Sequence, residues 1–320
     1  MRRALAVFAM LLLAGLSACG GGGGGGGSAS PYTGLTTPAV VTTSNADNIA
    51  RQAFQGGDLG ASTTLAPARS GDARAAAERP MDLTLVRILS GAANAAFPGP
   101  VAARAPQPRS TYTDWFPDGA GIGRVDFTLN INDVTGAFTG TFSFTNFHGD
   151  GGGIIDGPVA VSGYYDAQAQ SITEILFNFQ SVHIVDVAEG ADVTAIGTVD
   201  LISGTSGGSA ILNIVFIDNA SRKTLWLSNV TLVDTIGTGY YDTTLSGRIY
   251  IHDYGYVDVV TLAPFHYLTG NSYPSSGQFV VTGKDNKKVQ LTVADPTQYL
   301  LDVDTNGDGA WEVTAVVKYW

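Results

Sequence analysis

A run of oxygen-bearing side chains near the C-terminal end has the spacing of a cation-binding loop. Asp302, Asp304, Asn306 and Asp308 alternate along the chain, and Gly307 provides a sharp bend between the last two. Alternate residues around a tight turn point inward, and Ca2+ takes carboxylate and carbonyl oxygens as ligands. The spacing therefore predicts a calcium loop. The alternative is an acidic hairpin turn without an ion, because Asn-Gly and Asp-Gly are strong turn signals by themselves.

The first seven positions of this loop resemble the calcium loop of EF-hand proteins, which carries a bidentate Glu at position 12. Here that position is Val313, Glu312 stands one residue earlier, and the flanks are strand-like. The loop is also similar to the Asp-x-Asp-x-Asn/Asp-Gly loops of β-rich extracellular proteins. That second resemblance implies a structural Ca2+ site, with the ligands Asp302, Asp304, Asn306, Asp308 and, in addition, Glu312.

The histidines give little support to catalysis. None lies in a recognised catalytic or zinc motif, and Gly-x-Ser-x-Gly does not occur. His148 and Asp150 would suit a metal in a polar loop, although a solvated hairpin loop is favoured, and His252 is expected to bond Asp253. Glu is too rare and Asp too frequent for a pair of hydrolytic carboxylates to be assigned. A hydrolase acting on an envelope or extracellular polymer is therefore the alternative to a non-catalytic role.

Aromatic residues gather in the second half of the chain. They would suit a sugar or peptide groove, but packing within a sheet is favoured, because aromatic side chains pack well on strands. The set is Tyr164, Tyr165, Tyr240, Tyr241, Tyr250, Tyr254, Tyr256, Phe265 and Tyr267.

The first residues have the features of a secretory signal. Two arginines at positions 2–3 precede an apolar run over residues 4–16, which is too short to span a bilayer as a helix. The run ends in Leu-Ser-Ala-Cys, which resembles the lipobox of bacterial lipoproteins. In that family cleavage falls before the Cys, whose thiol takes a diacylglycerol and whose amine is acylated. The resemblance implies that Cys19 is a lipid anchor, and Gly20 after it is similar to outer-membrane sorting signals.

Charge and composition exclude several classes of protein. The formal net charge is −11, and the chain after residue 110 has eight Lys and Arg against 23 Asp and Glu. Such an acidic chain repels phosphate backbones, so no nucleic-acid partner is expected. The single Cys excludes a disulfide framework. Of the 28 acidic residues 24 are Asp, which closes turns, so a turn-rich and strand-rich chain is predicted.

Four segments are expected along the chain. They are a lipoprotein signal peptide (1–18), the lipidated Cys with a Gly-rich tether (19–30), an Ala/Pro-rich, partly helical or disordered segment (31–110) and an antiparallel β domain (111–320). Within the third segment, Ser44 or Asn45 is predicted to cap a helix through Phe54. A second helix is predicted from Pro80 to just before Pro98.

After residue 111, Thr-, Val-, Ile- and aromatic-rich runs alternate with Gly, Asp and Asn clusters. Phe138, Phe142 and Phe144 are predicted to share one face, whereas residues 224–233 are predicted to be buried on both faces. Short gaps imply antiparallel neighbours. The predicted fold is mainly β, a many-stranded antiparallel meander forming a sandwich, rolled sheet or barrel-like body, with short N-terminal helices. Thirteen strands are predicted, at 124–130, 137–147, 158–165, 171–184, 192–203, 209–218, 224–234, 240–252, 256–262, 277–283, 288–293, 298–302 and 312–319.

The last 75 or so residues resemble the C-terminal pattern of proteobacterial lipoproteins that have no established activity. The pattern is a strand over residues 247–262, Pro-x-Ser-Gly at 274–277, a short strand ending in Thr-Gly, and the acidic hairpin. The final Trp320 is similar to the end of outer-membrane barrels, but Lys318 breaks their alternation, so a last strand packed by Trp320 is expected instead.

Together these patterns predict a lipoprotein of the outer membrane, either periplasmic or surface-facing. Its role is expected to be non-catalytic binding or structure, with one Ca2+ and an unknown protein, glycan or peptide partner. The remaining alternative is a receptor-like surface lipoprotein.

Overall fold

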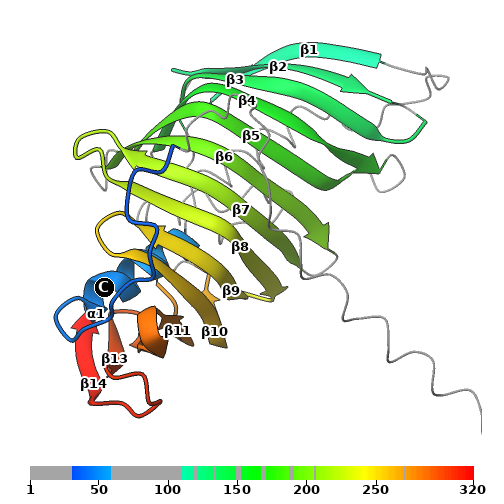
Figure 1. The fold of residues 1–320 in the computed structure, drawn as a ribbon. Helices are drawn as coiled ribbons and strands as arrows, with labels where there is room; N and C mark the ends of the chain where they lie inside the picture. Colours follow the sequence, from blue (N-terminus) through cyan, green and yellow to red (C-terminus); the bar gives the residue numbers. More distant parts are fainter. Residues whose placement is uncertain are drawn as a thin grey trace, which may run out of the picture. The chain divides into compact units, whose positions relative to one another are not determined.

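The computed structural model of the chain describes residues 31–58, 110–118, 122–132, 134–148, 153–166, 171–186, 191–204, 207–269, 271 and 273–320. These residues hold one α-helix, α1 (Ala46–Asp58), and fourteen strands (Figure 1). The strands are β1 (Ser110–Pro117), β2 (Arg124–Ile131), β3 (Ala137–His148), β4 (Gly153–Asp166), β5 (Ser171–Asp186), β6 (Ala191–Gly204), β7 (Gly207–Asp218), β8 (Thr224–Gly237), β9 (Tyr240–Ile251), β10 (Gly255–Leu268), β11 (Ser276–Thr282), β12 (Lys288–Asp295), β13 (Gln298–Asp304) and β14 (Val313–Tyr319). A 3-10 turn, η2 (Lys284–Asn286), separates β11 from β12.

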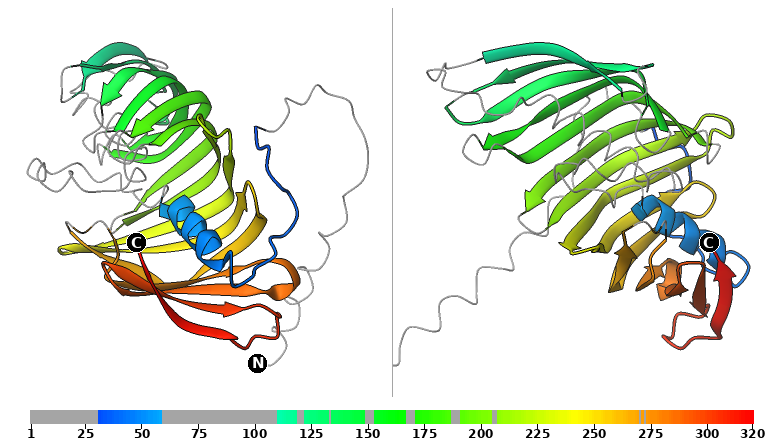
Figure 2. Two further views of the ribbon diagram at one scale, coloured as in Figure 1. Left: turned by 90° about the vertical axis from the view of Figure 1, so that its left-hand side faces the viewer. Right: turned by 180° about the vertical axis from the view of Figure 1, so that it is seen from behind.

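The strands form a single sheet in chain order, β1 to β14, and every neighbouring pair is antiparallel. The predicted antiparallel meander is therefore confirmed. Among the described residues β1 and β14 each pair with one neighbour, so the sheet is open. Sheets of more than about ten twisted strands tend to curl, and Figure 2 shows this sheet rolled, with α1 beside its later strands. Of the three forms predicted, the structure is the rolled sheet.

Three strands differ most from the prediction, and one of them, β4, begins at Gly153 rather than at residue 158. β1 was not predicted, because Asp114 and Pro117 interrupt its short apolar pattern. β10 was predicted to end at residue 262 but continues to Leu268. Its pairing with β11 shifts register on both sides of Ala263, and residues 262–264 are all exposed. A bulge of this kind inserts unpaired residues and breaks the alternation on which the prediction depended.

The predicted burial of β8 on both faces is wrong, and a bulge gives the reason. Asn229 has a φ of 52°, in the left-handed region, and the register of β8 with β9 shifts between Ser228 and Thr231. One extra residue moves the side chains that follow to the opposite face. Leu227 and Val230 are therefore both fully buried, although three residues separate them.

The inner face of the rolled sheet is the hydrophobic core. Phe138, Phe142 and Phe144 are all buried, as their alternation predicts. Helix α1 lies inside the curve (Figure 2). Its Phe54 packs edge-on against Phe265 at 5.2 Å between ring centroids. Burying a Phe side chain of this kind stabilises the fold by about 2–3 kcal/mol. None of the helices among the described residues is long and apolar enough to cross a membrane.

The end of the chain packs into the same core. The ring of Trp320 lies 4.7 Å from Phe54, 4.6 Å from Tyr299 and 5.0 Å from Tyr273, centroid to centroid. The prediction of a last strand packed by Trp320 is thus confirmed. The Tyr299 hydroxyl donates a hydrogen bond of 2.7 Å to Asp47 of α1, and burial followed by this bond raises the pKa of Tyr299.

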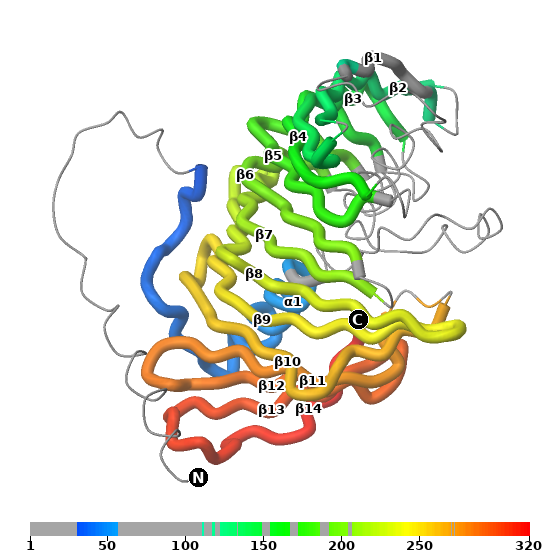
Figure 3. Tube along the Cα trace, turned by 90° about the vertical axis from the view of Figure 1, so that its right-hand side faces the viewer, coloured from blue at the N-terminus to red at the C-terminus, as the bar shows by residue number. Residues whose placement is uncertain are grey.

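Residues 31–41, the N-terminal strap, run along one end of the sheet before α1 begins (Figure 3). The Leu35 N–H donates to the His252 carbonyl at 3.0 Å, and the Ala39 N–H donates to the Tyr256 carbonyl at 2.8 Å. The Lys284 N–H donates to the Ala39 carbonyl at 2.7 Å. The strap therefore joins the β9–β10 turn to the β11–β12 turn. The predicted first helix is confirmed, and the predicted second helix lies outside the described residues.

Asn45 fixes the bend between the strap and α1. Its carbonyl accepts the helical N–H of Ile49 at 2.9 Å, while its side chain turns back to accept from Thr42 N at 2.8 Å and donate to the Val40 carbonyl at 2.9 Å. Asn45→Ala should therefore lower the free energy of unfolding by about 1 kcal/mol, measured by urea denaturation. Asn48→Ala, on the exposed face of the same helix, is the control, and an equal loss there would contradict this role for Asn45.

Candidate functional site

The acidic loop connects the last two strands of the sheet. β13 and β14 are antiparallel, with Val303 opposite Val313, and the Glu312 N–H donates to the Val303 carbonyl at 3.0 Å. The loop between them comprises residues 305–312. The hairpin thus holds Asp304 and Glu312 at the two ends of the same loop.

Asp304 holds the backbone of the loop through two hydrogen bonds. Its side chain is fully buried, and its two carboxylate oxygens accept the Gly307 N–H at 2.6 Å and the Gly309 N–H at 2.9 Å. Both glycines have φ angles in the left-handed region, +83° and +89°. Gly307 also approaches the neighbouring η2 turn, where a Cβ would lie 2.1 Å from the Asp285 carbonyl oxygen. Glycine at this position is therefore required twice, by the backbone angle and by the close approach.

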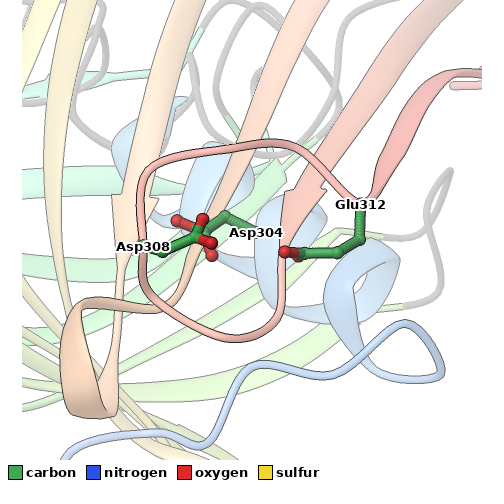
Figure 4. Close-up of side chains that lie close together, drawn as sticks. All are labelled: Asp304, Asp308 and Glu312. Carbon is green, nitrogen blue, oxygen red and sulfur yellow. The ribbon is translucent and has the colours of Figure 1, made fainter.

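Asp308 and Glu312 complete a group of three carboxylates, which converge within the ring of the loop (Figure 4). One oxygen from each of Asp304, Asp308 and Glu312 lies within 4.8 Å of the other two. Asp308 accepts the Ala310 N–H at 2.8 Å, and Glu312 accepts the Thr305 N–H at 2.6 Å. These bonds orient the exposed side chains of Asp308 and Glu312 toward the buried Asp304.

Such a group has the chemistry to hold a hard cation. Ca2+ takes six to eight oxygen ligands at about 2.3–2.6 Å, and carboxylates, carbonyls and waters all serve. Each carboxylate has about four acceptor sites, so those occupied by N–H groups leave others for an ion. Three negative charges around one point also repel one another unless a cation or water screens them.

The structure does not bring Asp302 into this group. β14 has a bulge at Ala315, where φ is 53°. At this bulge the Ala315 N–H donates to the Asp302 carboxylate at 2.8 Å. Asp302 also accepts from the Gln290 side chain at 3.2 Å. Asn306 stays beside the group, where its amide nitrogen donates to Asp308 at 3.1 Å. Of the five predicted ligands, three are thus brought together, one is adjacent and one is used within the sheet.

The η2 turn that supports the loop was not predicted. Asp285 and Asn286 both have left-handed φ angles, 56° and 57°, and the Asn286 side chain donates to the Gly307 carbonyl at 3.3 Å. The signal was local, since Asn and Asp tolerate this conformation better than other residues. Its contact with Gly307 is 21 residues away along the chain and is a product of the fold.

A second carboxylate, Asp118, joins three strand ends near the opposite edge. It accepts the N–H groups of Ile122, Gly123 and His148 at 2.9, 2.9 and 3.0 Å, and it contacts His148 Nδ1 at 2.9 Å. Burial alone would raise the pKa of Asp118, but the three backbone N–H groups and the His148 ring outweigh burial and lower the pKa to about 2. His148 is thus engaged by Asp118, and Asp150 lies outside the described residues.

The other histidines also contact polar side chains of adjacent strands or turns. His183 Nε2 lies 2.8 Å from Asp192, and His266 Nδ1 lies 2.7 Å from Asp242. The predicted bond between His252 and Asp253 is not formed. His252 Nδ1 lies 3.2 Å from the Thr224 hydroxyl, and Asp253 pairs with Lys223.

Several members of the aromatic set pack across strands, against one another or against other rings. Tyr241 stacks on Tyr267 at 4.7 Å and 3°, and Tyr250 stacks on Trp226 at 4.4 Å and 18°. The Arg248 guanidinium lies 3.9 Å above the Tyr256 ring. These contacts favour the packing interpretation of the aromatic residues over a ligand groove.

Comparison with known proteins returned no relative. A scan against protein-family models, a search of the curated proteins and a search of the solved structures each found no match to this chain.

Proposed function

We propose that the chain is a lipid-anchored protein of the bacterial cell envelope, held in the outer membrane through Cys19, with a non-catalytic binding or structural role. One calcium ion at the β13–β14 loop stabilises its sheet. The signal-like first residues and the Leu-Ser-Ala-Cys motif support the anchor. Cys19 itself lies outside the described residues.

The convergence of Asp304, Asp308 and Glu312 carries the calcium part of the proposal. The loop closes the hairpin at one open edge of the sheet, so an ion there would join β13 to β14. Edge strands lack a second neighbour and are where a rolled sheet is easiest to open. The ion's role is therefore structural.

The described histidine–carboxylate pairs support a structural use of the polar groups. Asp118 with His148, and Asp192 with His183, each join segments from different strands. The partner that a binding role requires is a protein, a glycan or a peptide, since the acidic charge opposes nucleic acid.

Acylation at Cys19 is tested by growing bacteria that express the full chain with an alkyne-tagged fatty acid. The full chain should take up the label, and Cys19→Ser should lose essentially all of it, because the thiol and the freed amine are the acylated groups. Ser30→Ala, outside the lipobox, is the control and should label fully. Label retained by Cys19→Ser, or absent from the unaltered chain, would reject the anchor.

A further inference from the structure

Helix α1 covers one half of the inner face of the rolled sheet. It packs against β8, β9 and β12, and its Phe54 contacts Phe265 of β10 and Phe279 of β11. The helix has 13 residues, so its length is about 20 Å. Neighbouring strands are about 4.8 Å apart, so this length reaches across about five strands. The strands from β8 to β12 therefore use the whole helix.

The strands before β8 are buried on the same face. Val230 of β8 lies on the inner face, and Leu212 of β7 is directly opposite it. Val199 of β6 lies opposite Leu212, and Phe177 of β5 lies opposite Val199. Each of these four side chains is at most 1% exposed. Since a buried face needs a layer of atoms packed on it, a layer other than α1 covers this half of the sheet.

The chain itself leads from α1 to this half. Near the end of α1, a Cβ on Gly56 would lie 3.0 Å from the Leu227 side chain of β8, and β1 begins at Ser110 next to β2. Seven strand spacings separate β8 from β1, which is about 34 Å along the sheet. About ten extended residues would span that distance, whereas residues 59–109 number 51. Most of them are therefore available to form a layer.

Residues 83–97, which we call the inner segment, are the most apolar stretch between α1 and β1. They include one charged residue, Arg87, whereas residues 59–82 include six. The helix predicted from the sequence over this stretch has apolar side chains on both of its sides, and a helix that is apolar all round is typical of a protein interior. These side chains include Leu83, Leu85, Val86, Ile88 and Leu89.

We infer that the inner segment lies on the inner face of β2–β7 and forms the second layer of the core. As a helix its 15 residues would be about 22 Å long, enough for about five of the six strands. The partner of this apolar face is thus the chain itself. The outer face and the turns are then left for the partner that the proposed binding role requires. The inference depends neither on the lipid at Cys19 nor on calcium.

Photo-cross-linking tests where the inner segment lies. The chain from residue 19 onward, carrying Cys19→Ser, is made with p-benzoylphenylalanine in place of Phe97. Peptide mapping should place its cross-links in β2–β7, residues 124–218. The same probe in place of Leu65, before the inner segment, is the control and should give at least about tenfold fewer cross-links to these strands, because only side chains in contact react. Cross-links from position 97 to β8–β14 alone, or equal yields from the two positions, would overturn the inference.

Thiol labelling tests the burial of the inner segment independently. Cys19 is the single Cys of the chain, so Ile88→Cys and Ala76→Cys in the Cys19→Ser background each carry one thiol. In native buffer Ile88→Cys should react with a maleimide at least about 100-fold more slowly than Ala76→Cys, because a buried thiol reacts only after local opening. In concentrated urea the two rates should be equal. Equal rates in native buffer would overturn the inference and leave an apolar ligand as the occupant, which mass spectrometry of the purified chain would detect.

Discussion

Calcium should raise the unfolding temperature of the chain by about 4 °C when its concentration is about one hundred times the dissociation constant. At that ratio, binding to the folded state alone stabilises it by about 2.7 kcal/mol. The larger unit of the chain spans residues 31–320, and unfolding a unit of that size has an entropy of about 0.6 kcal/mol/K. Mg2+ should have little effect, because it requires a smaller octahedral site and gives up its waters reluctantly.

Asp304→Ala should remove this response. The substitution deletes the buried carboxylate and leaves the N–H groups of Gly307 and Gly309 without their acceptor, so the variant should also lose about 2 kcal/mol in EDTA. Differential scanning calorimetry in EDTA and in Ca2+ measures both effects. Asp258→Ala, which removes an exposed surface carboxylate, is the control. An equal calcium shift in Asp304→Ala would exclude the loop as the site.

Asp118→Asn should destabilise the chain by about 3 kcal/mol at neutral pH. The side chain of Asp118 is fully buried and accepts from three backbone N–H groups, and an amide would turn a donor toward some of them. Urea denaturation measures the loss. Asp126→Asn breaks an exposed ion pair with Arg124 and should cost less than about 1 kcal/mol. Similar losses in the two variants would contradict the role given to Asp118.

The effect of Asp118 should also depend on pH. Because the pKa of Asp118 in the folded chain is lowered to about 2, its ionised form stabilises the fold above the ordinary Asp pKa of about 3.9. This contribution is lost as the pH falls from about 4 toward 2. The difference in stability between the parent and Asp118→Asn should therefore shrink as the pH falls below 4. A difference that stays constant down to pH 2.5 would show that ionisation is not its source.

The strand pattern could be predicted from the sequence because alternation and turn residues are local signals. Twelve-residue runs such as Ala137–His148 show one apolar face and end in polar clusters. Bulges could not be predicted in the same way. The bulge at Asn229 turns an apparent two-faced strand into a one-faced strand, and the bulges around Ala263 hide the second half of β10. A single inserted residue reverses every later side chain, and only the pairing with the neighbouring strand shows where it lies.

The spacing of the acidic residues was enough to predict the loop, but not to predict which of them form the group of three carboxylates. Alternation places Asp302 and Asp304 together, whereas the bulge at Ala315 diverts Asp302 to a backbone N–H across the hairpin. Glu312 looked misplaced by one residue, yet β14 begins directly after it, and it reaches Thr305 N from there. No sequence pattern singled out Asp118, because its hydrogen-bond partners come from segments up to 30 residues away along the chain.

The most direct test of the calcium site is isothermal titration calorimetry of Ca2+ into two matched variants. Asp308→Asn and Asp302→Asn make the same chemical change six residues apart, and both acids belong to the spacing that first suggested a calcium loop. The structure places only Asp308 in the group with Asp304 and Glu312. We expect one calcium per chain for the parent and for Asp302→Asn, and binding at least tenfold weaker for Asp308→Asn. No heat from the parent, or an equal loss in both variants, would contradict the account.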